Sequence, residues 1–131
     1  MLQHGLLDNG RSWIINKDED SLALQLADEG YDVWMMNSRG TMDSFEHVDP
    51  QKNSVYKLNS DFWKFSWDSM GEYDVPANIN YILSRSQFDK VHYVGHSQGG
   101  TQFFAANAVS DDIAPKIASF TGLAPVLYIR N

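Results

Sequence analysis

Short apolar runs alternate with helical patterns along this sequence. The runs predict four strands and the patterns three helices, in the order strand, helix, strand, helix, strand, helix, strand, at residues 2–4, 22–29, 31–36, 74–86, 91–94, 98–109 and 118–124. Connections of helical length join parallel strands and are right-handed, so that helices come to cover the sheet. The sequence therefore predicts an α/β domain with a parallel sheet, helices on both faces and a site at the carboxyl ends of the strands.

Side-chain chemistry indicates where these helices begin and end. Asp20-Ser21 can cap the first helix, and Gly30 can end it in a left-handed conformation. Asp74 can cap the second helix, where Pro76 is tolerated in the first turn. The strand before residue 37 is expected to end in the turn Asn37-Ser38-Arg39-Gly40.

Length and charge limit the class of protein. The chain has 131 residues, which favours a single domain over residues 1–131. Ten Lys and Arg oppose 17 Asp and Glu, and the resulting charge of −7 argues against a nucleic-acid partner. No apolar run approaches the roughly 20 residues of a membrane-spanning helix, and MLQHGLLDNG has no signal-peptide pattern. The absence of Cys excludes disulfides, thiolate metal sites and cysteine nucleophiles.

One motif carries chemistry. Gly95-His96-Ser97-Gln98-Gly99 matches G-x-S-x-G and lies between an expected strand and an expected helix, as a nucleophile elbow does. The elbow holds Ser97 in a strained turn, and side chains larger than hydrogen at Gly95 and Gly99 would collide with the strand and the helix. The N–H of Gln98 opens the helix and can face a developing oxyanion. The alternative is a rigid glycine turn without chemistry.

The end of the first strand can complete an oxyanion hole. Gly5 in His4-Gly5-Leu6 allows a sharp turn, so that the N–H of Leu6 can face the same point as that of Gln98. An isolated His-Gly pair is only a strand-ending turn. Beside an elbow at the same sheet edge, the functional interpretation is favoured.

Several blocks in register extend this pattern over nearly the whole chain. They are Leu2-Gln3-His4-Gly5-Leu6-Leu7, 26–34, Asn37-Ser38-Arg39-Gly40, 62–67, 73–77, 93–99 and Leu123-Ala124-Pro125-Val126. The sequence here resembles the acid lipases, the gastric and lysosomal type of α/β-hydrolase. The resemblance implies hydrolysis of neutral lipid esters (triacylglycerols or sterol esters) at a lipid–water interface, with no cofactor, no metal and no obligate protein partner. It also implies secretion or a lysosome-like compartment.

By residue match, the resemblance makes Ser97 the nucleophile, and Leu6 and Gln98 the donors of the oxyanion N–H groups. A serine nucleophile also needs a histidine base and an acid, in the chain order Ser, acid, His. None of the four histidines follows Ser97: His4, His47, His92 and His96. We expect His4 to belong to the oxyanion turn, His47 to a loop, His92 to pack against a helix, and His96 to point away from the serine hydroxyl.

Asp111 and Asp112 are expected in a solvated turn. The resemblance places the triad Asp and His, and the lid, beyond residue 131. We therefore expect an internal fragment: a partial α/β-hydrolase fold without the lid and the carboxyl-terminal part, inactive or nearly so alone.

Three other interpretations remain open. The aromatic group Tyr56, Phe62, Trp63, Phe65 and Trp67 is expected to pack in a core or line an acyl groove rather than stack on bases or sugars. The acidic run Asp18-Glu19-Asp20 lacks the spacing of a calcium loop and suits a helix start. The rival function is a non-catalytic protein that keeps the hydrolase sheet for binding.

Overall fold

The computed structural model describes residues 1–49 and 61–128. In these residues the strands are β1 (Leu2–Gln3), β2 (Met35–Met36), β3 (Val91–His96) and β4 (Ile117–Leu123). They form one sheet in the order β2-β1-β3-β4, and every neighbouring pair is parallel. The expected parallel α/β architecture is confirmed, and the carboxyl ends of all four strands meet at one edge.

The helices are α1 (Leu22–Asp28), α2 (Trp67–Ser69), α3 (Val75–Arg85) and α4 (Gln98–Val109). Short 3₁₀ turns cover Gly10–Ile14, Asp18–Asp20, Asp61–Trp63 and Ala114–Lys116, and a π turn, η5 (Met70–Asp74), joins α2 to α3. Helix α4 has the bounds that the sequence predicts. In the described ranges no helix has the length and apolar character needed to cross a membrane.

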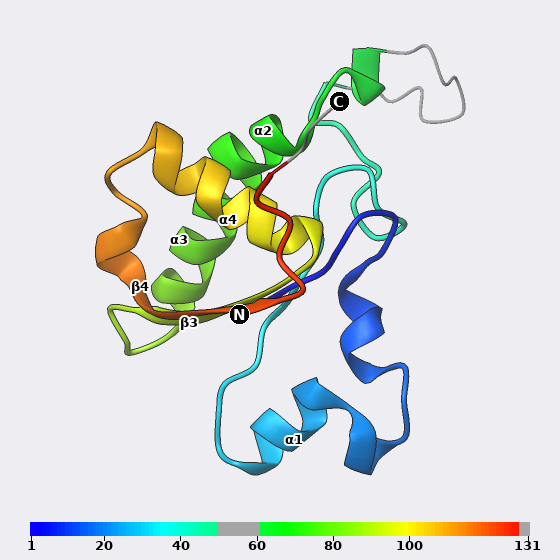
Figure 1. Cartoon of the computed structure of the whole chain (residues 1–131), viewed down its shortest axis with the longest axis vertical. Helices are drawn as coiled ribbons and strands as arrows, with labels where there is room; N and C mark the ends of the chain where they lie inside the picture. Colours follow the sequence, from blue (N-terminus) through cyan, green and yellow to red (C-terminus); the bar gives the residue numbers. More distant parts are fainter. Residues whose placement is uncertain (50–60, 129–131) are drawn as a thin grey trace.

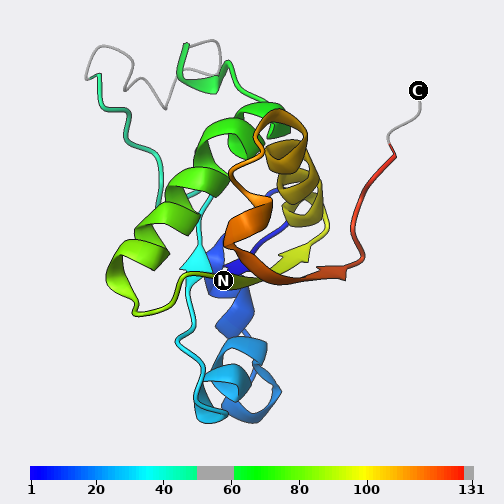
Figure 2. The same cartoon turned by 90° about the vertical axis from the view of Figure 1, so that its left-hand side faces the viewer.

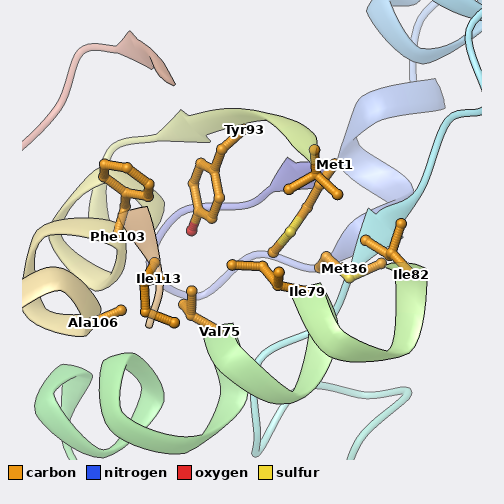
Figure 3. Packing of buried hydrophobic residues seen from close by; sticks show 10 residues of the cluster. Met1, Met36, Val75, Ile79, Ile82, Tyr93, Phe103, Ala106 and Ile113 are labelled. Carbon is orange, nitrogen blue, oxygen red and sulfur yellow. The ribbon is translucent and has the colours of Figure 1, made fainter. Parts of the chain in front are cut away.

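Helices cover both faces of the sheet. Helices α2, α3 and α4 lie on one side of the strands and α1 on the other (Figures 1 and 2). Successive strand residues point to opposite sides. Met1 and Tyr93 pack with Ile79 of α3 and Phe103 of α4 in the larger cluster of buried residues, which Figure 3 shows at close range. Leu2, which follows Met1 in the chain, points to the other side of the sheet. It packs there with Trp13 and with Ala23 of α1.

Helix α1 begins and ends where the sequence predicts, but the expected side-chain cap at its start is absent. Gly30 has a φ of 88°, and the N–H groups of Gly30 and Tyr31 donate to the carbonyls of Ala27 and Leu26, which is a Schellman motif. The prediction that the Ser21 side chain caps this helix is wrong. Its hydroxyl donates backwards to the carbonyls of Asn16 and Lys17, so it fixes the preceding turn instead.

Two other sequence predictions fail for physical reasons. The strand expected at 31–36 is only Met35–Met36, because β2 is an edge strand that pairs with the two residues of β1, and Tyr31 is exposed. Asp74 does not cap a helix, because the chain is already helical through η5 when it reaches Asp74. Its carboxylate binds Arg39 instead.

Candidate active site

Ser97 lies at the tip of a tight turn between β3 and α4. Its φ of 50° and ψ of −118° are a strained combination for a residue with a side chain. The neighbouring strand holds this turn, because the Ser97 N–H donates to the carbonyl of Leu123 at the end of β4, over 2.9 Å. The strained backbone that the elbow motif predicts is therefore present, and Gln98 is the first residue of α4.

The glycines on either side of Ser97 are needed for close packing. A Cβ added to Gly95 would lie 2.8 Å from the N of Gly100, inside the first turn of α4. A Cβ added to Gly99 would lie 2.5 Å from the carbonyl oxygen of Gln3 and 2.8 Å from that of His4. The predicted collisions with strand and helix are thus confirmed, and α4 begins directly against the end of β1.

The loop after β1 reaches the elbow. A Cβ added to Gly5 would lie 3.1 Å from the Cβ of Ser97 and 3.1 Å from Nδ1 of His96. Leu6 and Leu7 follow with 64% and 98% of their surface exposed, and Leu7 has a φ of 59°. The structure thus brings His4-Gly5-Leu6 and the Ser97 turn together at one edge of the sheet, as the sequence predicts.

The rings of His4, His47 and His92 have partners other than Ser97. In the described part of the chain, no histidine ring hydrogen-bonds the Ser97 hydroxyl. Nδ1 of His47 accepts the N–H of Asp49, and both ring nitrogens of buried His4 bind backbone groups. The prediction that His92 packs against a helix is wrong: its ring is exposed, with Nδ1 2.8 Å from the Ser119 hydroxyl, and it forms a T-shaped pair with the ring of Tyr31.

A buried tyrosine supports the elbow from the core. Tyr93 on β3 is fully buried, and its hydroxyl donates to the carbonyl of Gly99 over 3.0 Å. Burial raises the pKa of Tyr93 far above that of a free tyrosine, so the hydroxyl keeps its proton and remains a donor. This bond ties the first turn of α4 to the strand that leads into Ser97.

The arrangement of strand, strained serine turn and helix is matched by a family comparison. The model of a family described as the alpha/beta hydrolase fold matches residues 1–130. The chain belongs to the α/β-hydrolases.

Within the α/β-hydrolases, the expected resemblance to the acid lipases is confirmed. A gastric triacylglycerol lipase of Rattus norvegicus is 47% identical over 130 residues, which are 98% of this chain and 31% of the relative. A putative lysosomal acid lipase/cholesteryl ester hydrolase of Crotalus adamanteus is 45% identical over 129 residues, with the same coverage. The lysosomal acid lipase/cholesteryl ester hydrolase of Macaca fascicularis is 44% identical over 128 residues. The chain thus spans about a third of the length of these relatives (31%).

The sequence analysis did not identify the contacts of three buried or partly buried side chains, Arg39, Asp74 and Gln102. Arg39 and Asp74 form a partly buried ion pair, with guanidinium-to-carboxylate distances of 2.8 and 2.6 Å. Gln102 on α4 is fully buried and faces the Ser38 hydroxyl. The available signal was the position of Ser38 and Arg39 in the turn after β2, at the carboxyl edge where a site is expected.

The other residues that the sequence analysis singled out either pack against one another or lie exposed to solvent. Phe62, Trp63 and Phe65 pack edge-on or tilted against one another, and Phe62 is buried, whereas Tyr56 lies outside the described residues. Asp111 and Asp112 are exposed after α4, as expected. Asp18–Asp20 form an exposed turn before α1, and the described ranges contain no cluster of His, Asp and Glu that could hold a metal.

Proposed function

We propose that Ser97 is the nucleophile of a serine hydrolase that cleaves neutral lipid esters, either triacylglycerols or sterol esters. The observation that carries this proposal is the backbone of Ser97, with φ at 50° on the turn between β3 and α4. A non-glycine residue is kept in such a conformation where the strain serves the site. The family and the packing of Gly5 against Ser97 support the same function.

The proposed oxyanion hole consists of the backbone N–H groups of Leu6 and Gln98. The N–H groups in the first turn of a helix have no acceptor inside the helix, and the helix dipole favours negative charge there. Gln98 opens α4, and Leu6 follows the residue that packs against Ser97. Donors at such positions are each worth about a factor of 10² to 10³ in rate.

In the proposed reaction, Oγ of Ser97 attacks the ester carbonyl carbon while a base takes its proton. The carbonyl oxygen becomes an oxyanion, the alcohol leaves with a proton, and an acyl ester remains on Ser97 until water hydrolyses it. Because the described histidines do not hydrogen-bond Ser97, we propose that the 131-residue chain alone is inactive or nearly so.

The lipid character of the substrate is supported by the names of the relatives and by the surface near Ser97. Gastric triacylglycerol lipase and lysosomal acid lipase/cholesteryl ester hydrolase are the names of proteins 44–47% identical to this chain. In the loop after β1, which packs against Ser97 through Gly5, Leu6 and Leu7 have 64% and 98% of their surface exposed. An apolar rim of this kind suits a water-insoluble ester.

A fluorophosphonate probe tests the nucleophile. With imidazole supplied as an external base, we expect the probe to label the chain at Ser97, at a rate that rises with imidazole concentration. Without imidazole we expect little labelling. Ser97→Ala is expected to remove the labelling, whereas Ser84→Ala, which changes an exposed serine bonded to the Tyr81 carbonyl, leaves it intact. Fast labelling without imidazole would contradict the proposed inactivity of the chain.

A chimera tests the substrate class. The 130 matched residues of this chain would replace the corresponding segment of the rat gastric lipase, which is 47% identical there. We expect this chimera to hydrolyse a triacylglycerol or a cholesteryl ester, and its Ser97→Ala variant to be inactive. The alternative function, a non-catalytic binding protein, predicts a folded chimera that hydrolyses neither ester and a chain that no imidazole concentration activates.

A further inference from the structure

A cluster of buried polar side chains adjoins the loop after β1, which contains Gly5 and the proposed oxyanion donor Leu6. Its four side chains have between 0 and 3% of their surface exposed, and they come from the end of β1, the turn after β2 and helix α4: Gln3, His4, Ser38 and Gln102. Polar side chains are buried at a cost unless they are hydrogen-bonded, so each bond in the cluster fixes a geometry.

Ser38 is at the centre of this cluster. Its hydroxyl accepts from Nε2 of Gln3 over 3.0 Å and faces the Gln102 amide, with Nε2 at 3.1 Å and Oε1 at 3.2 Å. It therefore joins β1 to α4. The neighbouring Arg39 fastens the turn itself, because Asp74 accepts its backbone N–H over 3.0 Å as well as its guanidinium.

The backbone of Ser38 fixes the tautomer of His4. The Ser38 N–H donates to Nε2 of His4 over 3.0 Å, and a backbone N–H can only donate, so Nε2 carries no proton. The ring proton is then on Nδ1, which donates to the carbonyl oxygen of Gly5 over 2.8 Å.

The Gly5 carbonyl belongs to the same peptide unit as the N–H of Leu6. A peptide unit is planar and trans, so its C=O and N–H point in opposite directions. All peptide bonds among the described residues are trans. When Nδ1 of His4 holds the Gly5 oxygen on one side, the Leu6 N–H must point to the other side of the same plane.

We propose that Ser38 is a positioning residue. Its hydroxyl, bonded to Gln3 and Gln102, holds the Ser38 backbone N–H on the ring of His4, and that ring sets the direction of the Leu6 N–H through the carbonyl of Gly5. This inference rests on the proposed function, because it assigns Leu6 to the oxyanion hole. The hydroxyl of Ser38 also contacts Gln102 of α4, the helix that carries the Gln98 N–H. This contact keeps the turn at Ser38 at a fixed distance from α4. Ser38 thus couples the two proposed donors without touching the substrate.

The test uses Ser38→Ala in the 131-residue chain, with Ser21→Ala as the matched control. Both serines are 2% exposed, but among the described residues the Ser21 hydroxyl bonds the turn before α1 and not the cluster around Ser38. Nitrogen-15 relaxation measures the order of each backbone N–H, and rigid amides have order parameters of about 0.85. In Ser38→Ala we expect the value for Leu6 to fall below about 0.6 while that for Gln98 is unchanged. In Ser21→Ala we expect both to keep their wild-type values.

A kinetic measurement adds a second arm. In imidazole-assisted labelling by the fluorophosphonate, Ser38→Ala is expected to lower the maximal labelling rate at least tenfold and to leave the half-saturating probe concentration unchanged. A variant that merely loses stability would respond in the same way as Ser21→Ala. An unchanged Leu6 order parameter in folded Ser38→Ala overturns the proposal. Loss of order at Leu6 with no Ser97 labelling in any variant supports the positioning role and refutes the hydrolase.

A pair of His4 variants tests the same connection if Ser38→Ala does not fold. His4→Asn keeps an N–H donor near the position of Nδ1, whereas His4→Gln keeps a polar group near Nε2 and loses the bond to the Gly5 carbonyl. We expect Leu6 to stay ordered in His4→Asn and to become mobile in His4→Gln. Equal order at Leu6 in the two variants overturns the proposal.

Discussion

The hydroxyl of Tyr93 donates to the carbonyl oxygen of Gly99 over 3.0 Å, and both residues are buried. Tyr93 precedes Ser97 on β3 and Gly99 follows it on α4, so the bond closes the elbow from inside the core. Gly99 itself packs on the carbonyls of Gln3 and His4. The strained serine is therefore held on both sides by groups that cannot move independently.

Removing the Tyr93 hydroxyl is expected to change stability in a pH-dependent way. At neutral pH, Tyr93→Phe leaves the Gly99 carbonyl without its donor and costs about 1 kcal/mol of unfolding free energy. Burial raises the pKa of Tyr93 above its ordinary value of 10.0, so in alkali the unfolded chain loses this proton first. The wild-type free energy of unfolding should then fall above about pH 10, by up to about 1.4 kcal/mol per pH unit from this group.

Urea titrations of both proteins between pH 7 and 12 measure this effect. The other tyrosines are common to the two chains and cancel in the difference. We expect the advantage of the wild type at pH 7 to shrink and then reverse as the pH rises. A difference that stays constant with pH would show that Tyr93 does not resist ionisation.

Two glycine substitutions should differ sharply in cost. In Gly99→Ala the new Cβ meets backbone oxygens at 2.5 and 2.8 Å, so β1 and α4 must separate, at about 3 kcal/mol. In Gly30→Ala nothing lies within 4 Å of the new Cβ, and only the left-handed backbone at φ 88° opposes it, at about 1 to 2 kcal/mol. Equal midpoints in urea would contradict the close approach of α4 to β1.

Relief of the backbone strain at Ser97 should raise the free energy of unfolding. Ser97→Gly places a residue without a Cβ at a φ of 50°, and we expect it to be about 1 kcal/mol more stable than Ser97→Ala. Ser110 lies in extended backbone at a φ of −149°, so Ser110→Gly gains no such relief and should be less stable than Ser110→Ala. Thermal denaturation of the four variants checks both differences. The same sign at both positions would argue against strain at Ser97.

The ion pair of Arg39 and Asp74 should matter more than an exposed one. Asp74→Asn leaves a partly buried guanidinium without its anion and weakens the acceptor of the Arg39 N–H, at about 1 to 3 kcal/mol. In the pair of Arg11 and Asp43, the arginine side chain is 74% exposed, and Arg11→Gln should cost below about 0.5 kcal/mol. Comparable losses in urea for the two variants would contradict the anchoring role of Asp74.

Much of the sheet and the elbow could be predicted because their signals are local. Gly95 and Gly99 flank Ser97 at fixed spacing, and the apolar run before them makes β3 recognisable. The bounds of α4 follow from the same motif. Its first turn must begin where the strained serine ends.

The rest depended on contacts between distant residues. The hydroxyl of Ser21 could bond either the first turn of α1 or the turn that precedes it. In the folded chain the preceding turn packs against Ser21, so the hydroxyl donates to its carbonyls. Asp is a common residue at helix N-caps, but the Asp74 carboxylate binds Arg39, which is 35 positions away in the sequence. Ser38 and Gln102 are 64 positions apart, so no periodicity could reveal their bond.

The two faces of the sheet differ in the number of apolar residues buried against them. In the described residues, the cluster on the side of α3 and α4 has ten buried members, whereas the cluster beneath α1 has three: Leu2, Trp13 and Ala23. Local opening begins where little apolar surface must be exposed. Helix α1 can therefore detach transiently while the serine turn, anchored through Tyr93 in the larger cluster, keeps its shape. The proposed nucleophile is thereby separated from the smaller of these two clusters.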